Sequence, residues 1–273
     1  MISTIQKNIN EFLHQSKKPL LILIQGCTCS GKTTFANYLH AHLEKVITTT
    51  MISLDNYYKQ VNHDYFNSEI TSYDFDNPKA FEWNNLSKTL KGYINKDDII
   101  FKYNYDFNKS LSTEYKVKNT YPKIIILEGL YSFNLFSDNK FDLTKLNPYK
   151  SALEYDDVPL ELNDASLRNQ FITLKIMLTM NKDDIKNILL YRNANYRNSD
   201  DVTHNFNTIL INKFNHYIWP ATEKWGLLGK KEADVIIVGG TRNKKDIKIV
   251  TNAILTPFNY KDQLITFEKF IDH

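Results

Sequence analysis

The sequence predicts an α/β fold built on a doubly wound, mostly parallel sheet. Short apolar runs typical of buried strands recur along the chain, at residues 20–24, 124–127, 171–180 and 233–240. Helical patterns lie between these runs, and a glycine-rich loop joins the first run to the helix that follows it. Strands that alternate with helices favour a parallel sheet whose ligands bind at the carboxyl ends of the strands.

The first part of the chain supplies its elements in a simple order. Apolar residues at helical spacing predict a helix over residues 2–13, before the first strand. Residues 46–58 are rich in β-branched side chains and predict a second strand that ends near Asp55. A helix is expected over residues 76–94, because this stretch opens with a capping residue and carries Pro78 in its first turn.

The rest of the chain departs from simple alternation in two places. Two strand-like pieces at residues 99–105 and 115–120 predict a small hairpin outside the main sheet. Helices are expected at residues 183–191 and 202–219, before the last strand. Residues 137–168 are acidic, and we expect an irregular insertion of surface character there.

Composition narrows the class of protein. A chain of 273 residues can form one large α/β domain with an ample core. Its 34 basic and 31 acidic residues leave a net charge of +3, which argues against a nucleic-acid partner. The N-terminus lacks the apolar region of a signal peptide, and no run approaches 18 apolar residues. We therefore expect a cytoplasmic protein that does not bind a membrane.

The loop between the first strand and its helix carries the clearest chemical signal. Residues 26–33 fit G-x-x-x-x-G-K-[ST] in the strand–loop–helix setting that makes this pattern a phosphate cradle. The loop N–H groups and the helix N-terminus would stabilise an anion, Lys32 would reach the β- and γ-phosphates, and the Thr33 hydroxyl would hold Mg²⁺. The predicted contacts to ATP or GTP are Gly26, Cys27, Thr28, Cys29, Ser30, Gly31, Lys32, Thr33 and Thr34. The alternative is a glycine turn with a solvated lysine.

The only two cysteines lie inside this loop. Cys27 and Cys29 are one residue apart, a separation that is poor for a disulfide, and two cysteines do not make a zinc site. We expect them to fill space in the loop, in a reducing compartment.

Two carboxylates are expected beside the loop, because each follows a predicted strand. Asp55 stands at the rim of the ligand crevice, where it could accept a proton from an attacking hydroxyl, or it could form a turn with Asn56. Glu128 follows four apolar residues and precedes a glycine, so it could bind Mg²⁺ directly or through a ligand, unless it is an isolated surface glutamate. The predicted metal-binding residues are Thr33, Glu128 and Asp55.

Arginine is scarce, with only four among the 34 basic residues. In such a chain an arginine indicates a need for a planar, bidentate donor. Arg192 and Arg197 lie five residues apart near the end of a predicted helix, where they could close over the triphosphate and stabilise the transferring group. The alternative is that they cap the C-terminus of the helix.

Taken in order, these segments resemble the uridine kinase branch of the P-loop kinases, which is related to phosphoribulokinase and pantothenate kinase. The resemblance runs from about residue 20 to residue 240, through GCTCSGKTT, SLDNYYK, YDFDNPKAFEW, YNYDF, IIILEGLYSF, FNHYIWPATEKW and ADVIIVGG. Many NTPases share the first motif, whereas the ordered set is much more specific.

The resemblance implies a role for each matched residue. Asp55 would be the catalytic base, working with Lys32, Arg192 and Arg197, the two arginines belonging to a helical lid. Asp76 would grip the ribose hydroxyls through charge-assisted hydrogen bonds. The aromatic rings would pack the base of the nucleoside. The implied acceptor-binding residues are Tyr58, Asp76, Tyr105, Phe107, Ser110 and Arg192.

The same resemblance implies a single P-loop kinase domain over residues 1–273. The nucleotide core would comprise about 18–58, 121–136 and 170–240, the acceptor region about 59–120, the lid about 190–201 and the insertion about 137–168. Tetramers are common in this family, so the resemblance allows for a homo-oligomer.

Departures from the family pattern concern the acceptor. Members that read uracil or cytosine usually have a histidine where this chain has Ser110, and the lid usually carries further arginines where this chain has Leu189 and Ser199. Four hypotheses follow: a kinase acting on the 5′-hydroxyl of uridine or cytidine, a kinase acting on another small alcohol, a nucleotide switch, and a regulatory nucleotide-binding protein. The N-K-x-D pattern of a guanine-reading switch is not met by NKFN at residues 212–215.

Overall fold

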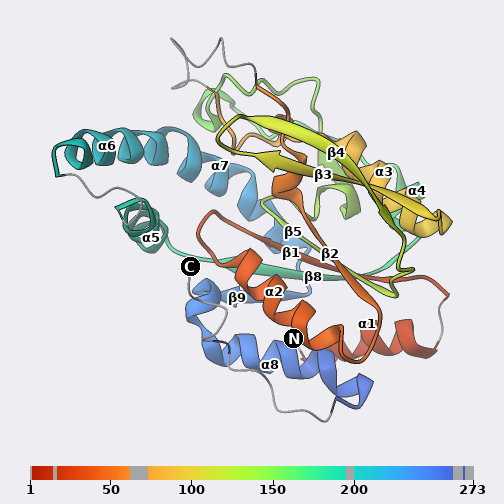
Figure 1. The fold of residues 1–273 in the computed structure, drawn as a ribbon. Coiled ribbons are helices and arrows are strands. Elements are labelled where there is room, and N and C mark those ends of the chain that lie inside the picture. The colour runs from red at the N-terminus through yellow and green to blue at the C-terminus, as the bar shows by residue number, and fades with distance from the viewer. Residues whose placement is uncertain (1, 15–16, 62–72, 195–199, 261–266, 268–273) are drawn as a thin grey trace.

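A five-stranded parallel sheet forms the centre of the protein in the computed structural model, which describes residues 2–14, 17–61, 73–194, 200–260 and 267 (Figure 1). Every neighbouring pair of strands is parallel. The predicted α/β class with a doubly wound sheet is therefore confirmed. The order across the sheet is β2 (Thr49–Ser53), β5 (Ile124–Gly129), β1 (Leu20–Gly26), β8 (Ile172–Thr179) and β9 (Val235–Val238).

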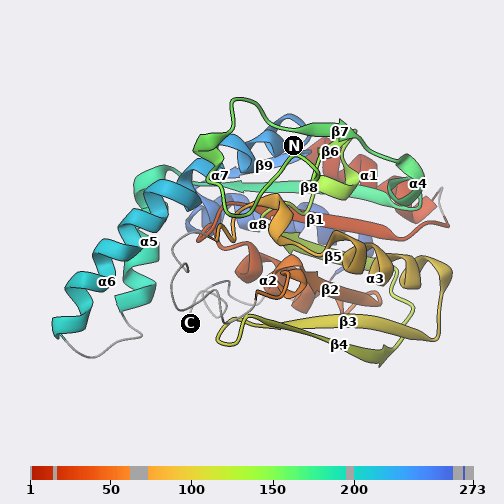
Figure 2. The ribbon, with the colours of Figure 1, turned by 90° about the horizontal axis from the view of Figure 1, so that it is seen from above.

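Helices cover both faces of this sheet (Figures 1 and 2). One face carries α1 (Ile2–His14), α2 (Lys32–Leu43) and α8 (Lys244–Leu255), and the other carries α3 (Trp83–Asn95) and α7 (Trp219–Lys224). Strand β1 serves both layers because its side chains alternate between the faces. Leu20, Ile22 and Ile24 pack on the α1–α2–α8 side, whereas Leu21 and Leu23 enter the opposite cluster.

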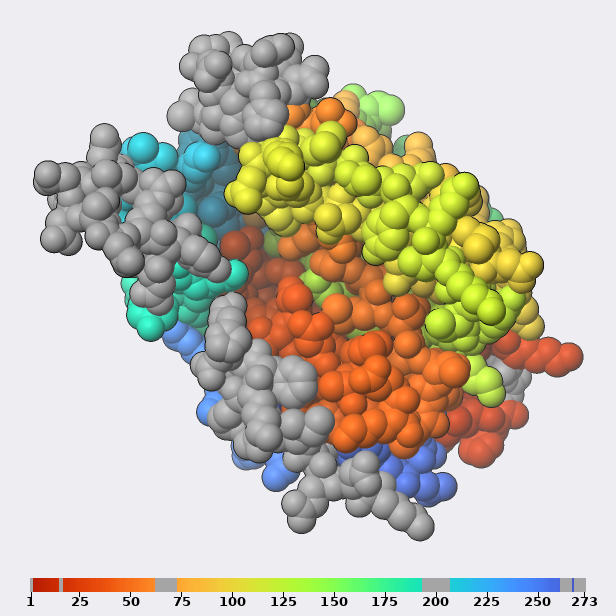
Figure 3. Space-filling model, viewed as in Figure 1, coloured from red at the N-terminus to blue at the C-terminus, as the bar shows by residue number. Residues whose placement is uncertain are grey.

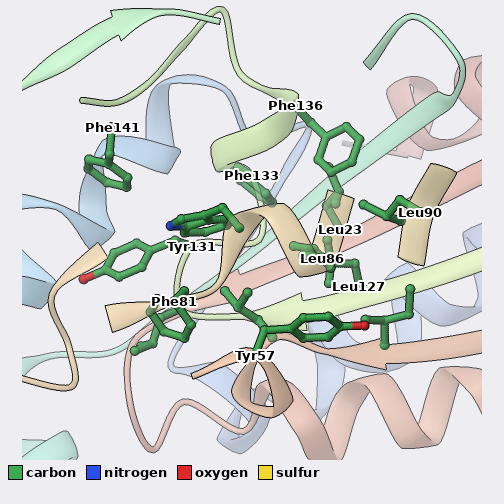
Figure 4. Close-up of a cluster of buried hydrophobic side chains, with 14 of the residues drawn as sticks. Leu23, Tyr57, Phe81, Leu86, Leu90, Leu127, Tyr131, Phe133, Phe136 and Phe141 are labelled. Carbon is green, nitrogen blue, oxygen red and sulfur yellow. The ribbon is translucent and has the colours of Figure 1, made fainter. Parts of the chain in front are cut away.

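That opposite cluster is the larger apolar core. Figure 4 shows its aromatic members, with Phe81, Tyr131 and Phe133 beside Leu23 and Leu127 of the central strands. Residues from distant parts of the chain meet here, so this cluster fixes the segments around the site relative to the sheet.

The expected hairpin outside the main sheet is present. β3 (Ile99–Asp106) and β4 (Leu111–Lys118) pair only with each other in the described structure, in antiparallel register. Their connection is four residues long, from Phe107 to Ser110, shorter than the sequence pattern indicated.

The helix predicted from residue 76 begins later than expected. Asn77 caps a 3₁₀ turn, Pro78–Ala80, and α3 starts only at Trp83. Between them Phe81 is extended and forms a β-bridge with Tyr58, and the two rings stack with centroids 4.4 Å apart. This tertiary contact interrupts the helix that the local sequence favours.

The prediction that residues 137–168 form an irregular surface stretch is confirmed only in part, because much of the stretch is irregular and exposed whereas other parts form short elements or are buried. The stretch contains an antiparallel pair, β6 (Asn139–Phe141) and β7 (Leu160–Leu162), and the short helix α4 (Ala165–Arg168). Phe141, Leu146 and Ala152 are buried in the larger core. These three residues follow neither helical nor strand spacing, so the sequence pattern did not predict that they are buried.

Residues 190–201, the predicted lid, fall on the end of α5 (Lys182–Ala194) and the start of α6 (Asp200–Lys213), and residues 195–199 lie outside the described part of the chain. The single helix predicted at 202–219 is divided, because a π-helical segment, Phe214–Ile218, separates α6 from α7. Pro220 supplies the reason: it has no N–H to donate to the carbonyl of His216, four residues earlier. No helix in the described parts of the chain is both long and apolar enough to cross a membrane.

Candidate active site

The glycine loop lies at the carboxyl end of β1, as its pattern predicts. Gly31 precedes α2 with φ 84°, a left-handed conformation that favours glycine. A Cβ atom at Gly31 would lie 2.2 Å from Thr241 Oγ1, and one at Gly26 would lie 2.5 Å from the carbonyl oxygen of Leu178. Both glycines are therefore required by close packing, Gly26 against β8 and Gly31 against the turn that follows β9.

Lys32 occupies the first turn of α2 and is buried. Its ammonium donates a hydrogen bond to the carbonyl of Cys27, 3.1 Å away. Its positive charge also lowers the pKa values of Asp55, Asp76 and Glu128, which burial raises. One lysine therefore lies within electrostatic reach of the three carboxylates that the sequence singled out.

Glu128 ends β5 beside Ser53 of β2, and it is fully buried. Its Oε1 accepts a hydrogen bond from the Ser53 hydroxyl, whereas Oε2 has no partner among the described residues. Burial, and secondly the charge of Asp55, raise the pKa of Glu128. A buried carboxylate oxygen without a partner, beside Asp55 and Thr33, is a suitable donor set for a hard cation such as Mg²⁺. Thr33 itself lies exposed on the first turn of α2.

Asp55 lies just past the end of β2, in the 3₁₀ turn Leu54–Tyr57. It is half-buried, and burial raises its pKa while the charge of Lys32 opposes that change. A carboxylate with a raised pKa that stays near a cation is suited to accepting a proton.

Asp76 connects the acceptor region to the glycine loop. Its Oδ1 accepts a hydrogen bond from the Thr28 hydroxyl at 3.1 Å, and its backbone carbonyl accepts one from the hydroxyl of Tyr131. Burial raises the pKa of Asp76 to about 6, although Thr28 and Lys32 favour the charged form. The candidate acceptor residue thus lies directly beside the predicted phosphate cradle.

An aromatic wall adjoins Asp76. The ring of Tyr58 contacts those of Tyr105 and Phe107, with centroids 5.4 and 5.9 Å away. Phe107 nevertheless remains 62% exposed, so one of its faces is available. Ser110 is buried at the end of the hairpin turn, with φ 50°. The space-filling view has a hollow between the hairpin and α5, with atoms of the glycine loop region on its floor (Figure 3).

On the lid side the structure brings one arginine to the loop. Arg192, on α5, points Nη1 toward Cys29 Sγ at 3.9 Å. Arg197 lies outside the described residues. Cys27 and Cys29 do more than fill the loop, because they pack with Ile185 of α5 and Phe214 of the π-helical segment in a small apolar cluster. The loop therefore contacts both α5 and the π-helical segment directly.

Three residues of the site were missed by sequence reasoning. Asp74 is a buried carboxylate two residues before Asp76, at the start of a turn in which its Oδ1 accepts the backbone N–H of Asp76. Tyr131 follows Glu128 closely, and Thr241 follows the glycine pair after β9. The backbone N–H of Thr241 donates to the carbonyl of Ser30 at 3.1 Å, so the turn after β9 supports the glycine loop.

Comparison with known proteins gives an independent view of the chain. Residues 21–143 match the model of the phosphoribulokinase / uridine kinase family. The chain is 27% identical over 237 residues to a uridine kinase from Ureaplasma parvum, covering 86% of this chain and 95% of the relative. It is 29% identical over 241 residues to a uridine kinase from Clostridium novyi, covering 87% of this chain and 95% of the relative.

Among solved structures, the fold is similar to that of phosphoribulokinase from Rhodobacter spheroides. The TM-score is 0.50 at 14% identity, over 82% of this chain and 71% of the other. This likeness concerns the fold alone, and it agrees with the parallel sheet covered by helices. Residues 21–143 thus resemble the phosphoribulokinase / uridine kinase family, and the chain is similar along most of its length to relatives named uridine kinase.

Proposed function

We propose that this protein transfers the γ-phosphoryl group of ATP to the 5′-hydroxyl of uridine or cytidine, giving the nucleoside monophosphate and ADP. The observation that carries the proposal is the hydrogen bond between Thr28 of the glycine loop and Asp76, beside the aromatic wall. It brings a carboxylate suited to a diol and rings suited to a flat base next to the phosphate cradle. Relatives named uridine kinase support the same acceptor.

Charge also favours a nucleoside over a sugar phosphate as the acceptor. Asp55 and Asp76 are close enough to influence each other, and Lys32 is a basic group whose charge acts on both. These negatively charged carboxylates would repel the negatively charged phosphate group of a phosphorylated acceptor. A neutral acceptor with several hydroxyls suits this environment.

In the proposed reaction the acceptor oxygen forms a bond to Pγ while the bond from Pγ to the β,γ-bridging oxygen breaks and ADP leaves. Asp55 takes the proton of the 5′-hydroxyl. Lys32 must leave the carbonyl of Cys27 to reach the phosphates. Arg192 would complete the charge stabilisation from α5, joined by Arg197 of the proposed lid.

Thr33 and Glu128, with Asp55, are the residues that would hold Mg²⁺. In the described part of the chain no three His, Cys, Asp or Glu side chains form a ready cage for a metal. Mg²⁺ usually binds through one or two carboxylates together with substrate phosphates and water, so such a cage is not required. When bound, Mg²⁺ supplies positive charge at the β- and γ-phosphates.

A panel of acceptors tests the proposal. Purified protein with Mg·ATP would be offered uridine, cytidine, ribulose 5-phosphate and pantothenate, and ADP release and product mass would be measured. Lys32→Ala, purified identically, serves as the blank for contaminating kinases. We expect ADP release with uridine and cytidine at similar efficiency, because Ser110 offers only one short hydroxyl for reading the base. Activity with another alcohol alone would refute the acceptor, and no activity with any alcohol would refute the kinase assignment.

A further inference from the structure

The stretch 147–152 of the insertion lies between two parts of the candidate site. Its first residues contact segment 73–77, which carries Asp76. Its last residues contact the π-helical segment and α7, which follow the lid helix α6 in the chain. We call residues 147–152 the bridging stretch.

On the acceptor side, the bridging stretch binds through backbone carbonyls. The carbonyl of Pro148 accepts the N–H of Asp74 at 2.6 Å, and the carbonyl of Asn147 accepts Nδ2 of Asn77 at 3.1 Å. Asp74 and Asn77 are almost completely buried. The ring of Tyr149 also meets that of Tyr73 edge-on, with centroids 5.3 Å apart. Segment 73–77 is therefore fixed on both sides of Asp76.

At its other end, the bridging stretch binds a backbone carbonyl of the π-helical segment that has no helical N–H partner at position 220. Pro220 cannot donate to the carbonyl of His216, and the hydroxyl of Ser151, which is fully buried, donates to that carbonyl instead. Lys224 donates to the carbonyl of Ala152 at 3.1 Å. Two hydrogen bonds thus attach the bridging stretch to the π-helical segment and to α7.

Asp74 links the bridging stretch to Asp76, because it forms hydrogen bonds with both Pro148 and Asp76. Its Oδ1 accepts the backbone N–H of Asp76 at 2.9 Å, while Oδ2 is buried without a partner among the described residues. Burial first, and then the neighbouring Asp76, raise the pKa of Asp74 well above its usual range. The backbone N–H of Asp76 needs an acceptor oxygen at this position, and an asparagine side chain has the same shape and would keep that oxygen.

We propose that the bridging stretch, acting through Asp74, is a positioning device that holds Asp76 in place for the acceptor by tying segment 73–77 to the π-helical segment. The proposal rests on the proposed function for its consequence in catalysis. Its structural part stands on the contacts alone. Asp74 is a positioning residue and Asp76 is the group that meets the acceptor.

Amide hydrogen exchange tests the structural part without any acceptor. Ser151→Ala removes the bond to His216, although Ser151 itself makes no hydrogen bond to segment 73–77. We expect faster exchange at the amides of residues 74–77 in this variant, by about tenfold for one lost support. Leu153→Ala, at a position in the same loop that is 64% exposed, is the matched control and should leave exchange unchanged. Equal exchange at 74–77 in the two variants would overturn the proposal.

Steady-state kinetics of two variants, Asp74→Ala and Asp74→Asn, test the effect of this positioning on acceptor binding. They also provide a test if Ser151→Ala folds poorly. Asp74→Ala removes the acceptor for the Asp76 amide and should raise the acceptor KM about tenfold, with the KM for ATP nearly unchanged. Asp74→Asn keeps that oxygen and should behave like the unmodified protein. Equal kinetic defects in both variants, or none in either, would refute the positioning role. Lack of activity with every nucleoside would refute the proposed function, while exchange would still decide the bridging role.

Discussion

Replacing the 2′-hydroxyl of the acceptor by hydrogen is the sharpest test of Asp76. The carboxylate is half-buried, and its Oδ1 already accepts the Thr28 hydroxyl at 3.1 Å. A ribose diol would therefore rely mainly on Oδ2. A 2′-deoxynucleoside then forfeits about one charge-assisted hydrogen bond, worth roughly 1.5–3 kcal/mol.

That loss corresponds to a ratio of about 10 to 150 in kcat/KM between uridine and 2′-deoxyuridine. It is well below the roughly 10⁴–10⁵ achieved by sites that bury such a polar group completely. The difference follows from the partial exposure of Asp76 and from its bond to Thr28, which together leave the carboxylate solvated and paired when the 2′-hydroxyl is missing.

Initial rates of ADP release over a range of both nucleosides give the ratio directly. Asp76→Ala should reduce the ratio to near 1 without restoring speed, and Asp157→Ala, at an exposed aspartate, should leave it unchanged. A ratio within about threefold of 1 in the unmodified protein would refute the reasoning, since it would amount to less than one hydrogen bond.

Three further predictions concern the same group of charges. Lys32→Ala should lower turnover by more than about 10² while the circular dichroism spectrum and unfolding midpoint change little, and near-normal turnover would contradict the phosphate-cradle role. Asp55→Asn should lower kcat by about 10²–10⁴, a larger effect than any loss of ATP affinity measured by calorimetry; a loss confined to ATP affinity would contradict the role of Asp55 as the base and leave it a metal-binding role alone. The acceptor KM should rise as the pH falls through about 6, because Asp76 must be ionised to accept the ribose hydroxyls. The same raised pKa means that the folded state binds this proton more tightly than the unfolded state, so the contribution of Asp76 to stability declines as the pH rises from about 4 to about 6. Asp76→Asn should flatten both pH dependences, and a profile unchanged in that variant would assign them to another group.

The parts of the fold that could be predicted are those in which a local pattern has one physical meaning. Strands β1 and β5 are wholly buried, so their continuous apolar runs identified them, and the glycine spacing of residues 26–33 encodes the backbone shape of the loop itself. Glu128 was placed beside the loop for the same reason, because parallel strands end at one edge of a sheet.

The parts that could not be predicted depend on contacts between distant residues. The late start of α3 requires Tyr58 to pair with Phe81, and the burial of Phe141 and Leu146 requires the core that they join. No local pattern announces such pairings. The packing of Cys27 against Phe214 is of the same kind, since the two are separated by most of the chain. The roles of Asp55, Asp76 and Arg192 remain predictions that the kinetic tests address.

The last prediction concerns the junction between the glycine loop and the turn after β9. Gly31 has φ 84°, and a Cβ atom there would also lie 2.2 Å from Thr241 Oγ1, so Gly31→Ala combines two penalties. The left-handed conformation alone costs an alanine about 1–2 kcal/mol, and the contact adds to it. Thr241→Gly removes the contacting side chain but leaves φ unchanged. We therefore expect Gly31→Ala to lower the free energy of unfolding, measured with urea, by more than about 1–2 kcal/mol, and the double variant to show a smaller loss than the two single losses added together. Strict additivity would contradict this, because it would mean that the Thr241 side chain does not contact the new Cβ atom. The turn after β9 would then support the glycine loop only through the backbone hydrogen bond from Thr241 to Ser30.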